Sequence, residues 1–192
     1  MRDEGPEALS ARAFEANRDR VVGQAGATPL LRQATAEHRP DCSVDVPNRN
    51  FEFDFFAAFE RWSGARGVAS AATLDLEQFR DVAAQFFRES GWGDVTISAL
   101  DGVVATVDAP DWAEAEAGAA LPHPGCHYSS ALLADFFGQV ADAPLAALEV
   151  ECRSSGGSRC RFLIGSESVL NAIYDQMATG VAYGVAVRTV AN

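Results

Sequence analysis

The stretch LEVECRSSGGSRCRFLIG, residues 148–165, decides most of what can be predicted about this chain. Two runs rich in apolar residues flank a turn of serine and glycine, a pattern that predicts a β-hairpin. Cys152 and Cys160 lie on either side of that turn, on strands that run side by side. We therefore expect these two cysteines to form a disulfide, a pair of buried thiols or half of a metal site.

A third cysteine, Cys126, opens a predicted helix over residues 126–141. The apolar face of that helix includes Leu132, Leu133, Phe136, Phe137 and Val140. A cluster of thiols from a helix start and a hairpin can bind zinc tetrahedrally if a fourth ligand is available. Core thiols and a disulfide across the turn are the alternatives to this metal site.

The residues alone leave the fourth ligand open. Local candidates are Glu149, Glu151, His127 and His123. Side chains alternate between the two faces of an ideal strand, so Glu149 and Glu151 would share one face and Cys152 would point to the other. Glu149 can join Cys152 only if the strand bulges or ends between them.

The other elements predict an α+β fold, an antiparallel sheet with packed helices. Residues 74–91 and 166–180 predict helices, and Asp75 with Gln78 resembles a capping box. Residues 92–109 predict two strands joined at Asp101-Gly102, a strong hairpin signal. Residues 65–73 favour a strand, and the apolar tail 181–190 favours a final strand or an interface. Residues 51–62 fit either a strand or a helix.

The chain has 192 residues, of which 48% are hydrophobic, and this suits one domain with a sizeable core. Residues 1–47 have weak helical patterns and end in a Pro-rich break, so we expect a helical N-terminal extension. Residues 48–192 are expected to form the domain itself, with its core over 80–180. Cys42 lies in the Pro-rich break and fits no motif, which predicts an unpaired thiol.

Charge and hydropathy exclude several classes of partner. The formal net charge of −12 disfavours binding to phosphate backbones and to anionic membranes. We find no run of about 18 apolar residues, so we expect no membrane span. The acidic N-terminal residues lack the pattern of a signal peptide, and we expect a cytoplasmic protein. In that compartment thiols are more often metal ligands or reduced than disulfide-bonded.

Residues 125–165, GCHYSSALLADFFGQVADAPLAALEVECRSSGGSRCRFLIG, resemble the core of the 4-vinyl-reductase domain family, a predicted hydrocarbon-binding domain. The shared pattern is a Cys-His pair opening an apolar helix, a Glu-x-x-Cys strand, a short turn with glycine and a further cysteine. This module forms the sensory domain of phenol- and xylene-responsive activators and occurs in a bacteriochlorophyll-pathway protein. The resemblance implies the ligand-binding fold of NO-signalling and Golgi-transport proteins.

The resemblance also implies a set of metal ligands. Phenol-type sensors hold zinc with three cysteines and a glutamate, and the glutamate lies three residues before the second cysteine. Carried over by motif, the ligands here are Cys126, Glu149, Cys152 and Cys160. Four protein ligands close a zinc site to water and substrate, so the implied zinc is structural and staples the hairpin to the helix.

A ligand cavity between helices and sheet is the second implied feature. Trp112 resembles the tryptophan that touches the ligand in the phenol sensors. Those sensors also use an upstream histidine, but residues 65–111 contain none. Tyr128, Phe136 and Phe86 are further candidates to contact a hydrophobic or aromatic ligand, with a role in the plain core as the alternative.

No motif typical of an enzyme is present: the chain lacks G-x-S-x-G, a P-loop and H-E-x-x-H. We therefore expect a binding domain for a hydrophobic or aromatic small molecule, with structural zinc, that acts as a sensor, carrier or assembly factor. We expect a homodimer. The alternatives are an accessory or catalytic protein of tetrapyrrole (bacteriochlorophyll) vinyl reduction, and a structural scaffold without a ligand.

Overall fold

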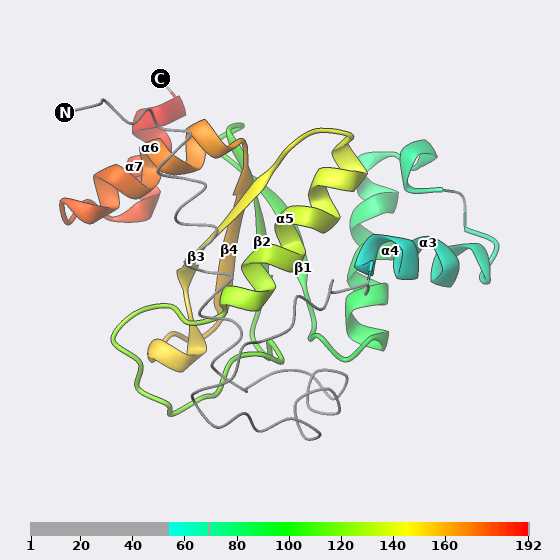
Figure 1. Ribbon diagram of the computed structural model, residues 1–192, viewed down its shortest axis with the longest axis horizontal. Coiled ribbons are helices and arrows are strands. Elements are labelled where there is room, and N and C mark those ends of the chain that lie inside the picture. Colours follow the sequence, from blue (N-terminus) through cyan, green and yellow to red (C-terminus); the bar gives the residue numbers. More distant parts are fainter. Residues whose placement is uncertain (1–53, 69, 192) are drawn as a thin grey trace, which may run out of the picture.

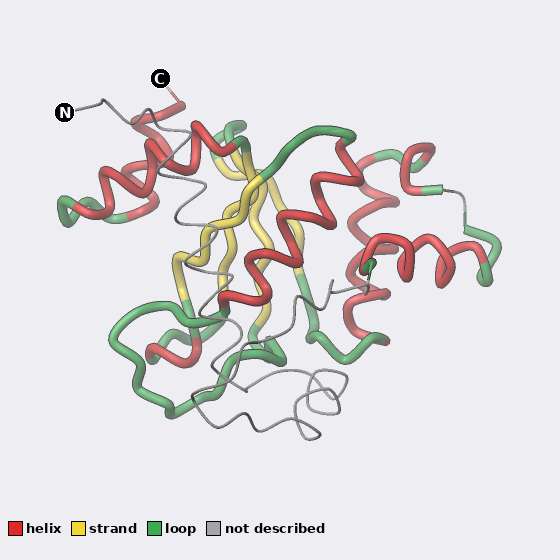
Figure 2. Tube along the Cα trace, viewed as in Figure 1, coloured by secondary structure: helices red, strands yellow, loops and turns green. Residues whose placement is uncertain are grey.

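The computed structural model describes residues 54–68 and 70–191, and this part of the chain has an α+β fold (Figures 1 and 2). Its sheet is antiparallel with the strand order β1-β2-β4-β3. The strands are β1 (Thr96–Leu100), β2 (Val104–Ala109), β3 (Ala146–Glu151) and β4 (Cys160–Gly165). The helices are α3 (Phe55–Gly64), α4 (Leu76–Glu89), α5 (His127–Ala141), α6 (Glu167–Ala178) and α7 (Tyr183–Ala191). Two short 3-10 turns are η1 (Ala71–Thr73) and η2 (Arg153–Ser155).

Helices cover both faces of the sheet (Figure 1). Helix α5 lies along one face with α3 and α4 beyond it, and α6 and α7 pack on the opposite face. Alternate residues of β4 enter the two cores: Phe162 and Ile164 face α3–α5, whereas Leu163 faces α6 and α7. A central strand that is buried on both sides in this way holds the two helical layers together.

Aromatic side chains fill the core between the sheet and α3–α5. Phe55 of α3 lies with its ring centroid 5.0 Å from Phe86 of α4 and 5.6 Å from Phe136 of α5. Phe59, which is fully buried, contacts the same two rings at 5.3 and 5.4 Å. Each buried phenylalanine contributes about 2 kcal/mol through the apolar area it removes from water. This cluster therefore fixes how α5 lies on the sheet.

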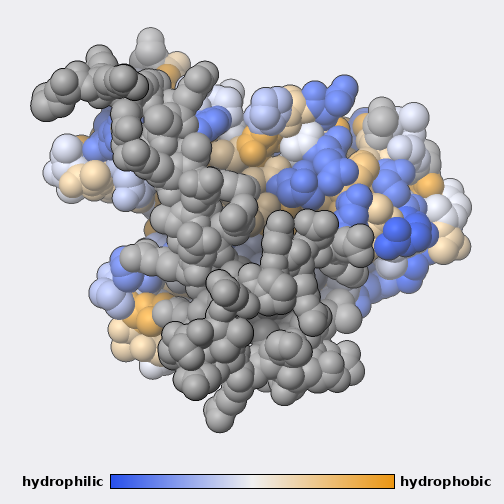
Figure 3. Space-filling model, in the orientation of Figure 1, coloured by the Kyte–Doolittle hydropathy of each residue, from blue (hydrophilic) through white to orange (hydrophobic). Residues whose placement is uncertain are grey.

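The outer surface of this layer is polar. In the space-filling view, hydrophilic side chains gather over the part of the surface formed by α3 and α4 (Figure 3). Exposed residues of α4 include Glu77, Asp81, Gln85 and Arg88. No helix in the described ranges is long and apolar enough to cross a membrane.

The helices and hairpins that capping residues, turn residues or apolar periodicity predict are present in the structure. Asp75 and Gln78 form the predicted capping box at the start of α4. Asp101 and Gly102 both have positive φ, 51° and 69°, in the hairpin turn that Val103 N–H closes by donating to the Leu100 carbonyl at 3.2 Å. The predicted helices over 126–141 and 166–180 are α5 and α6, and the hairpin of the quoted stretch is β3 and β4.

Two strand predictions are wrong. The described part of 65–73 is a turn followed by η1, and its backbone is tied to α3, because Ala71 N–H donates to the Glu60 carboxylate at 3.1 Å. The tail is the helix α7, which buries Ala186 and Val187 against the sheet and α6. Short apolar runs fit a buried helix as well as a strand, and here tertiary packing selects the helix. The expected extension over 1–47, with Cys42, lies outside the described residues.

The start of α5 is held by two carboxylates. The backbone N–H groups of Tyr128 and Ser129 donate to Glu114 at 3.1 and 2.8 Å, and that of Cys126 donates to Glu149 at 2.8 Å. Negative charge at a helix N-terminus is favourable, and the bonds satisfy amides that have no partner within the helix. Burial outweighs these bonds and raises the pKa of Glu114 to about 7.

The raised pKa of Glu114 predicts a pH-dependent stability. The pKa of Glu114 is about 7 in the folded protein and 4.5 in the unfolded chain, so the folded protein binds this proton more tightly. The stabilisation that results is fully present below pH 4.5 and is lost as pH rises through about 7. We expect the difference in unfolding free energy between wild type and Glu114→Gln to fall by up to about 3 kcal/mol over that range. Urea unfolding at successive pH values measures it, with Glu116→Gln in the same loop as control. A difference that does not change with pH would contradict the prediction.

Candidate metal centre

A β-bulge in β3 shapes the site. The pairing of β3 with β4 is regular from Ala146↔Gly165 to Glu149↔Phe162, but the next pair is Glu151↔Arg161. Two residues of β3 thus oppose one step of β4, and the extra residue between Glu149 and Glu151 is Val150. The bulge resets the alternation of faces, so Glu149 and Cys152 point to the same side of the sheet. This is the condition under which the sequence allows Glu149 to join the cysteines.

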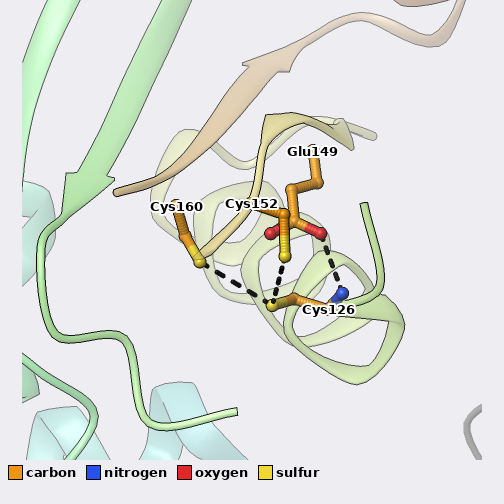
Figure 4. Close-up of side chains that lie close together, drawn as sticks. All are labelled: Cys126, Glu149, Cys152 and Cys160. Atoms are coloured by element: carbon orange, nitrogen blue, oxygen red, sulfur yellow. Dashed lines mark hydrogen bonds between the residues drawn. The ribbon is translucent and has the colours of Figure 1, made fainter. Parts of the chain in front are cut away.

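Four side chains converge on this side of the sheet (Figure 4). Cys126 comes from the N-cap of α5, Glu149 from β3, Cys152 from the residue after β3, and Cys160 from the first residue of β4. The Cys126 Sγ atom lies 3.7 Å from Cys152 Sγ and 3.9 Å from Cys160 Sγ. The four ligand atoms lie within 4.8 Å of one another, and all four residues are buried. Among the described residues this is the one group of three or more such side chains able to hold a metal ion.

The distances match a metal site better than a disulfide. A disulfide requires sulfurs about 2.05 Å apart, far less than the 3.7 and 3.9 Å seen here. Sulfurs that bind one zinc ion tetrahedrally at about 2.3 Å are about 3.8 Å apart. The second carboxylate oxygen of Glu149, Oε1, is buried and has no hydrogen-bond partner. The donor set therefore fits a tetrahedral metal ion.

The electrostatics of the group point the same way. Burial raises the pKa of Glu149 to about 8, with a further contribution from Cys152. The contacts of Cys126 with Cys152 and Cys160 raise the pKa of the Cys126 thiol, whereas hydrogen bonds with Cys126 and Cys160 lower the pKa of Cys152. Cys126 and Glu149 therefore hold protons that a metal cation bound beside the Cys152 sulfur would displace.

The turn of the quoted stretch closes tightly beneath Cys152. The amide of Gly157 donates to the Cys152 carbonyl at 2.9 Å. A Cβ atom on Gly157 would lie 2.8 Å from that carbonyl oxygen, and Gly156 has a φ of 90° that other residues rarely adopt. Both glycines are therefore needed to bring Cys160 back beside Cys152.

Two further residues hold the loop over 110–125 against the site. Ser154 accepts from the backbone N–H of Glu116 at 2.9 Å through its hydroxyl, and from that of Leu121 at 2.8 Å through its carbonyl. Glu114 binds the start of α5, as described above. The sequence analysis did not find Ser154 or Glu114, because contacts across 38 and 15 residues leave no local pattern.

The remaining ligand candidates do not join the converging group. Glu151 lies on the opposite face of the sheet, where it pairs with Arg159. His123 is exposed, and His127 is half-buried at the start of α5. Neither histidine belongs to the group of converging ligand atoms.

The four predicted contact residues for a small molecule lie in one aromatic cluster. Trp112 is buried beside Trp92, with ring centroids 5.5 Å apart, and its indole N–H donates to Ser129 at 2.7 Å. Tyr128 stacks on Trp92 at 6.0 Å. Phe86 and Phe136 are buried further along the cluster, where both contact Phe87. The three site cysteines belong to the same core.

The sequence and the fold were compared with known proteins. A solved structure of a vinyl-4-reductase family protein from Methanocaldococcus jannaschii is similar, with a TM-score of 0.39, 12% identity, and coverage of 85% of this chain and 97% of the other. No curated protein matches the sequence. The model of the 4-vinyl-reductase domain family matches residues 111–166. This segment contains all four converging side chains, and the match confirms the family resemblance over residues 111–166.

Proposed function

We propose that this protein is a binding domain for a hydrophobic or aromatic small molecule, built around a structural zinc ion, and that it acts as a sensor, carrier or assembly factor. The observation that carries the proposal is the convergence of three thiols and one carboxylate across the bulge in β3. Three thiolates favour zinc over the harder cations, which prefer oxygen ligands.

A structural role for the metal follows from the closure of the site. All four side chains are buried, and four protein ligands complete a tetrahedral shell without a position for substrate. The metal would join the N-terminus of α5 to the β3–β4 hairpin. We propose the ligands as Cys126, Glu149, Cys152 and Cys160, with zinc bound by the residues of this chain alone.

A small molecule would bind in the aromatic core beside the metal. The indole N–H of Trp92 is buried and has no hydrogen-bond partner, so an acceptor on a bound molecule would satisfy it. Trp112 and Tyr128 contact the Trp92 ring, and Phe86 and Phe136 lie further along the same cluster, where they would supply apolar contact area. An apolar or aromatic molecule with one polar oxygen fits this chemistry.

The proposal extends to the domain bounds, the cellular location and the oligomeric state of the protein. The binding domain spans residues 48–192, on the pattern of the NO-signalling and Golgi-transport ligand-binding fold, and residues 1–47 precede it. The protein works in the cytoplasm as a homodimer, in which a change on ligand binding in one chain passes to the other through their contact.

The metal site predicts that the purified protein contains about one zinc per chain, as expected from one four-ligand site. Cys152→Ser should lose the metal and unfold at a lower urea concentration, with a loss of about 4 kcal/mol if free zinc exceeds the dissociation constant about 1,000-fold. Elemental analysis and urea unfolding measure the two effects. Cys42→Ser is the matched control, because Cys42 is expected to be an unpaired thiol and its replacement should change neither quantity. Retention of zinc and full stability by Cys152→Ser would show that the metal site is wrong.

The binding proposal predicts that an organic molecule accompanies the purified protein. Native mass spectrometry should detect a mass beyond chain and zinc, and this mass should be lost under denaturing conditions. Trp92→Phe keeps an aromatic ring but removes the buried indole N–H that an acceptor on the bound molecule would satisfy, so it should keep zinc and hold less of the organic molecule.

Where no molecule co-purifies, thermal unfolding with naphthalene as the probe gives a second measurement. A probe at 100 times its dissociation constant stabilises the folded state by about 2.7 kcal/mol. If no organic molecule co-purifies and the probe does not stabilise the protein, the ligand-free scaffold is favoured. Turnover of a tetrapyrrole vinyl group would favour the enzymatic alternative.

A further inference from the structure

A network of charged side chains lies on the face of the sheet opposite the metal site. Arg161 of β4 donates two hydrogen bonds to Asp108 of β2, from Nε to Oδ1 at 2.6 Å and from Nη2 to Oδ2 at 2.7 Å. Arg159 donates to Glu151 of β3, from Nε to Oε2 at 2.8 Å and from Nη2 to Oε1 at 3.1 Å. Each arginine also approaches the other acid, at 3.6 and 3.9 Å, so the four charges alternate around a ring.

Tyr183, the first residue of α7, completes this network. Its hydroxyl accepts from Arg161 at 2.8 Å and donates to Glu151 at 2.5 Å. Glu151 thus accepts hydrogen bonds from Arg159, which directly precedes β4, and from Tyr183, which begins α7. The arginine contacts lower the pKa of the Glu151 carboxyl, with Arg159 as the largest cause.

Glu151 stands at the point where the bulge ends. It is the residue that resumes pairing with β4 after Val150, and the next residue is the metal-ligand candidate Cys152. If Glu151 were free to turn, β3 could pair in the regular register, which would carry Cys152 to the far face. The contacts that hold Glu151 on its own face therefore also hold Cys152 on the face of the other cysteines.

We propose that Glu151 is a positioning residue for the metal centre: held by Arg159 and Tyr183 on one face of the sheet, it fixes the bulge that presents Cys152 and Glu149 on the other. This inference rests on the proposed metal site. Glu151 itself does not touch the metal. Its effect passes through the backbone of β3, and Tyr183 links the centre to the docking of α7.

This network differs from an ordinary surface ion pair. Exposed pairs contribute about 0–1 kcal/mol, because solvent screens them and their side chains lose entropy. Here the side chains are only 16–35% exposed, and both arginines bind a carboxylate through two nitrogens. Paired arginine–carboxylate geometry of this kind restricts orientation as well as adding energy. The bulge keeps its register only if Glu151 stays on its own face of the sheet, and the restricted orientation of its side chain has this effect.

The test compares metal binding in the full-length protein and two variants. Glu151→Gln removes the charge and one acceptor of the paired contact, and Tyr183→Phe removes only the hydroxyl. Zinc affinity is measured by competition with a chromophoric chelator, and Co²⁺ is used as a spectroscopic probe of ligand geometry. We expect about a tenfold loss of zinc affinity for Glu151→Gln, at the low end of the range for residues that support metal ligands. A smaller loss is expected for Tyr183→Phe, and the Co²⁺ absorption bands should change in both.

Arg66→Gln is the matched control, because Arg66 pairs with Glu89 between α3 and α4, away from β3. Wild-type zinc affinity and an unchanged Co²⁺ spectrum are expected for it. If both network variants bind zinc within twofold of wild type with unchanged Co²⁺ spectra, the positioning role is wrong although the metal site stands. If all three variants lose affinity equally, the effect is general destabilisation, and the inference is again wrong. A wild-type protein that binds no zinc would overturn the metal site and this inference together.

Discussion

The one extra residue in β3 is the constraint on which the site depends. In a regular strand, residues three apart point to opposite faces, so the Glu149-x-x-Cys152 spacing would divide its two ligands between the two sides of the sheet. The bulge at Val150 changes this parity. It brings Cys152 beside Cys160 and Cys126, and it sends Glu151 to the other face. One extra residue in the strand thus places the candidate metal ligands on one face of the sheet and the paired charges of Glu151 and its partners on the other.

The rest of the fold places the other two candidate ligands, Cys126 and Cys160, beside the bulge. The aromatic core fixes α5 on the sheet, and Glu114 and Glu149 hold the first amides of the helix, so Cys126 is presented at a defined point. Gly157 lets the turn pass close to the Cys152 carbonyl and returns the chain to Cys160. Apolar packing and helix capping therefore position Cys126, the close backbone approach positions Cys160, and the bulge positions Glu149 and Cys152.

Sequence reasoning succeeded where the signal is local. The capping box at Asp75 and Gln78 and the turn at Asp101-Gly102 are determined by residues close together in the chain, and both were predictable. The strand predicted for 65–73, and the strand that was one of two alternatives for 181–190, were wrong, because only tertiary partners decide between strand and helix in short apolar segments. The fourth ligand was open for the same reason, since the contact from Tyr183 that holds Glu151 beside the bulge spans 32 residues. The family resemblance supplied Glu149, which periodicity alone would have placed on the wrong face.

A metal at this position would act as a cross-link between distant segments. It would join Cys126 to residues 26 and 34 positions later in the chain, and closing loops of this length restricts the unfolded chain by about 3–4 kcal/mol if the cross-link is permanent. A metal gives less than this wherever thiols of the unfolded chain retain it. The same cross-link fixes the start of α5, from which Tyr128 and Ser129 reach the Trp92 and Trp112 rings. The metal would therefore hold one wall of the aromatic core in place, so that loss of the metal and loss of small-molecule binding are coupled through the first turn of α5.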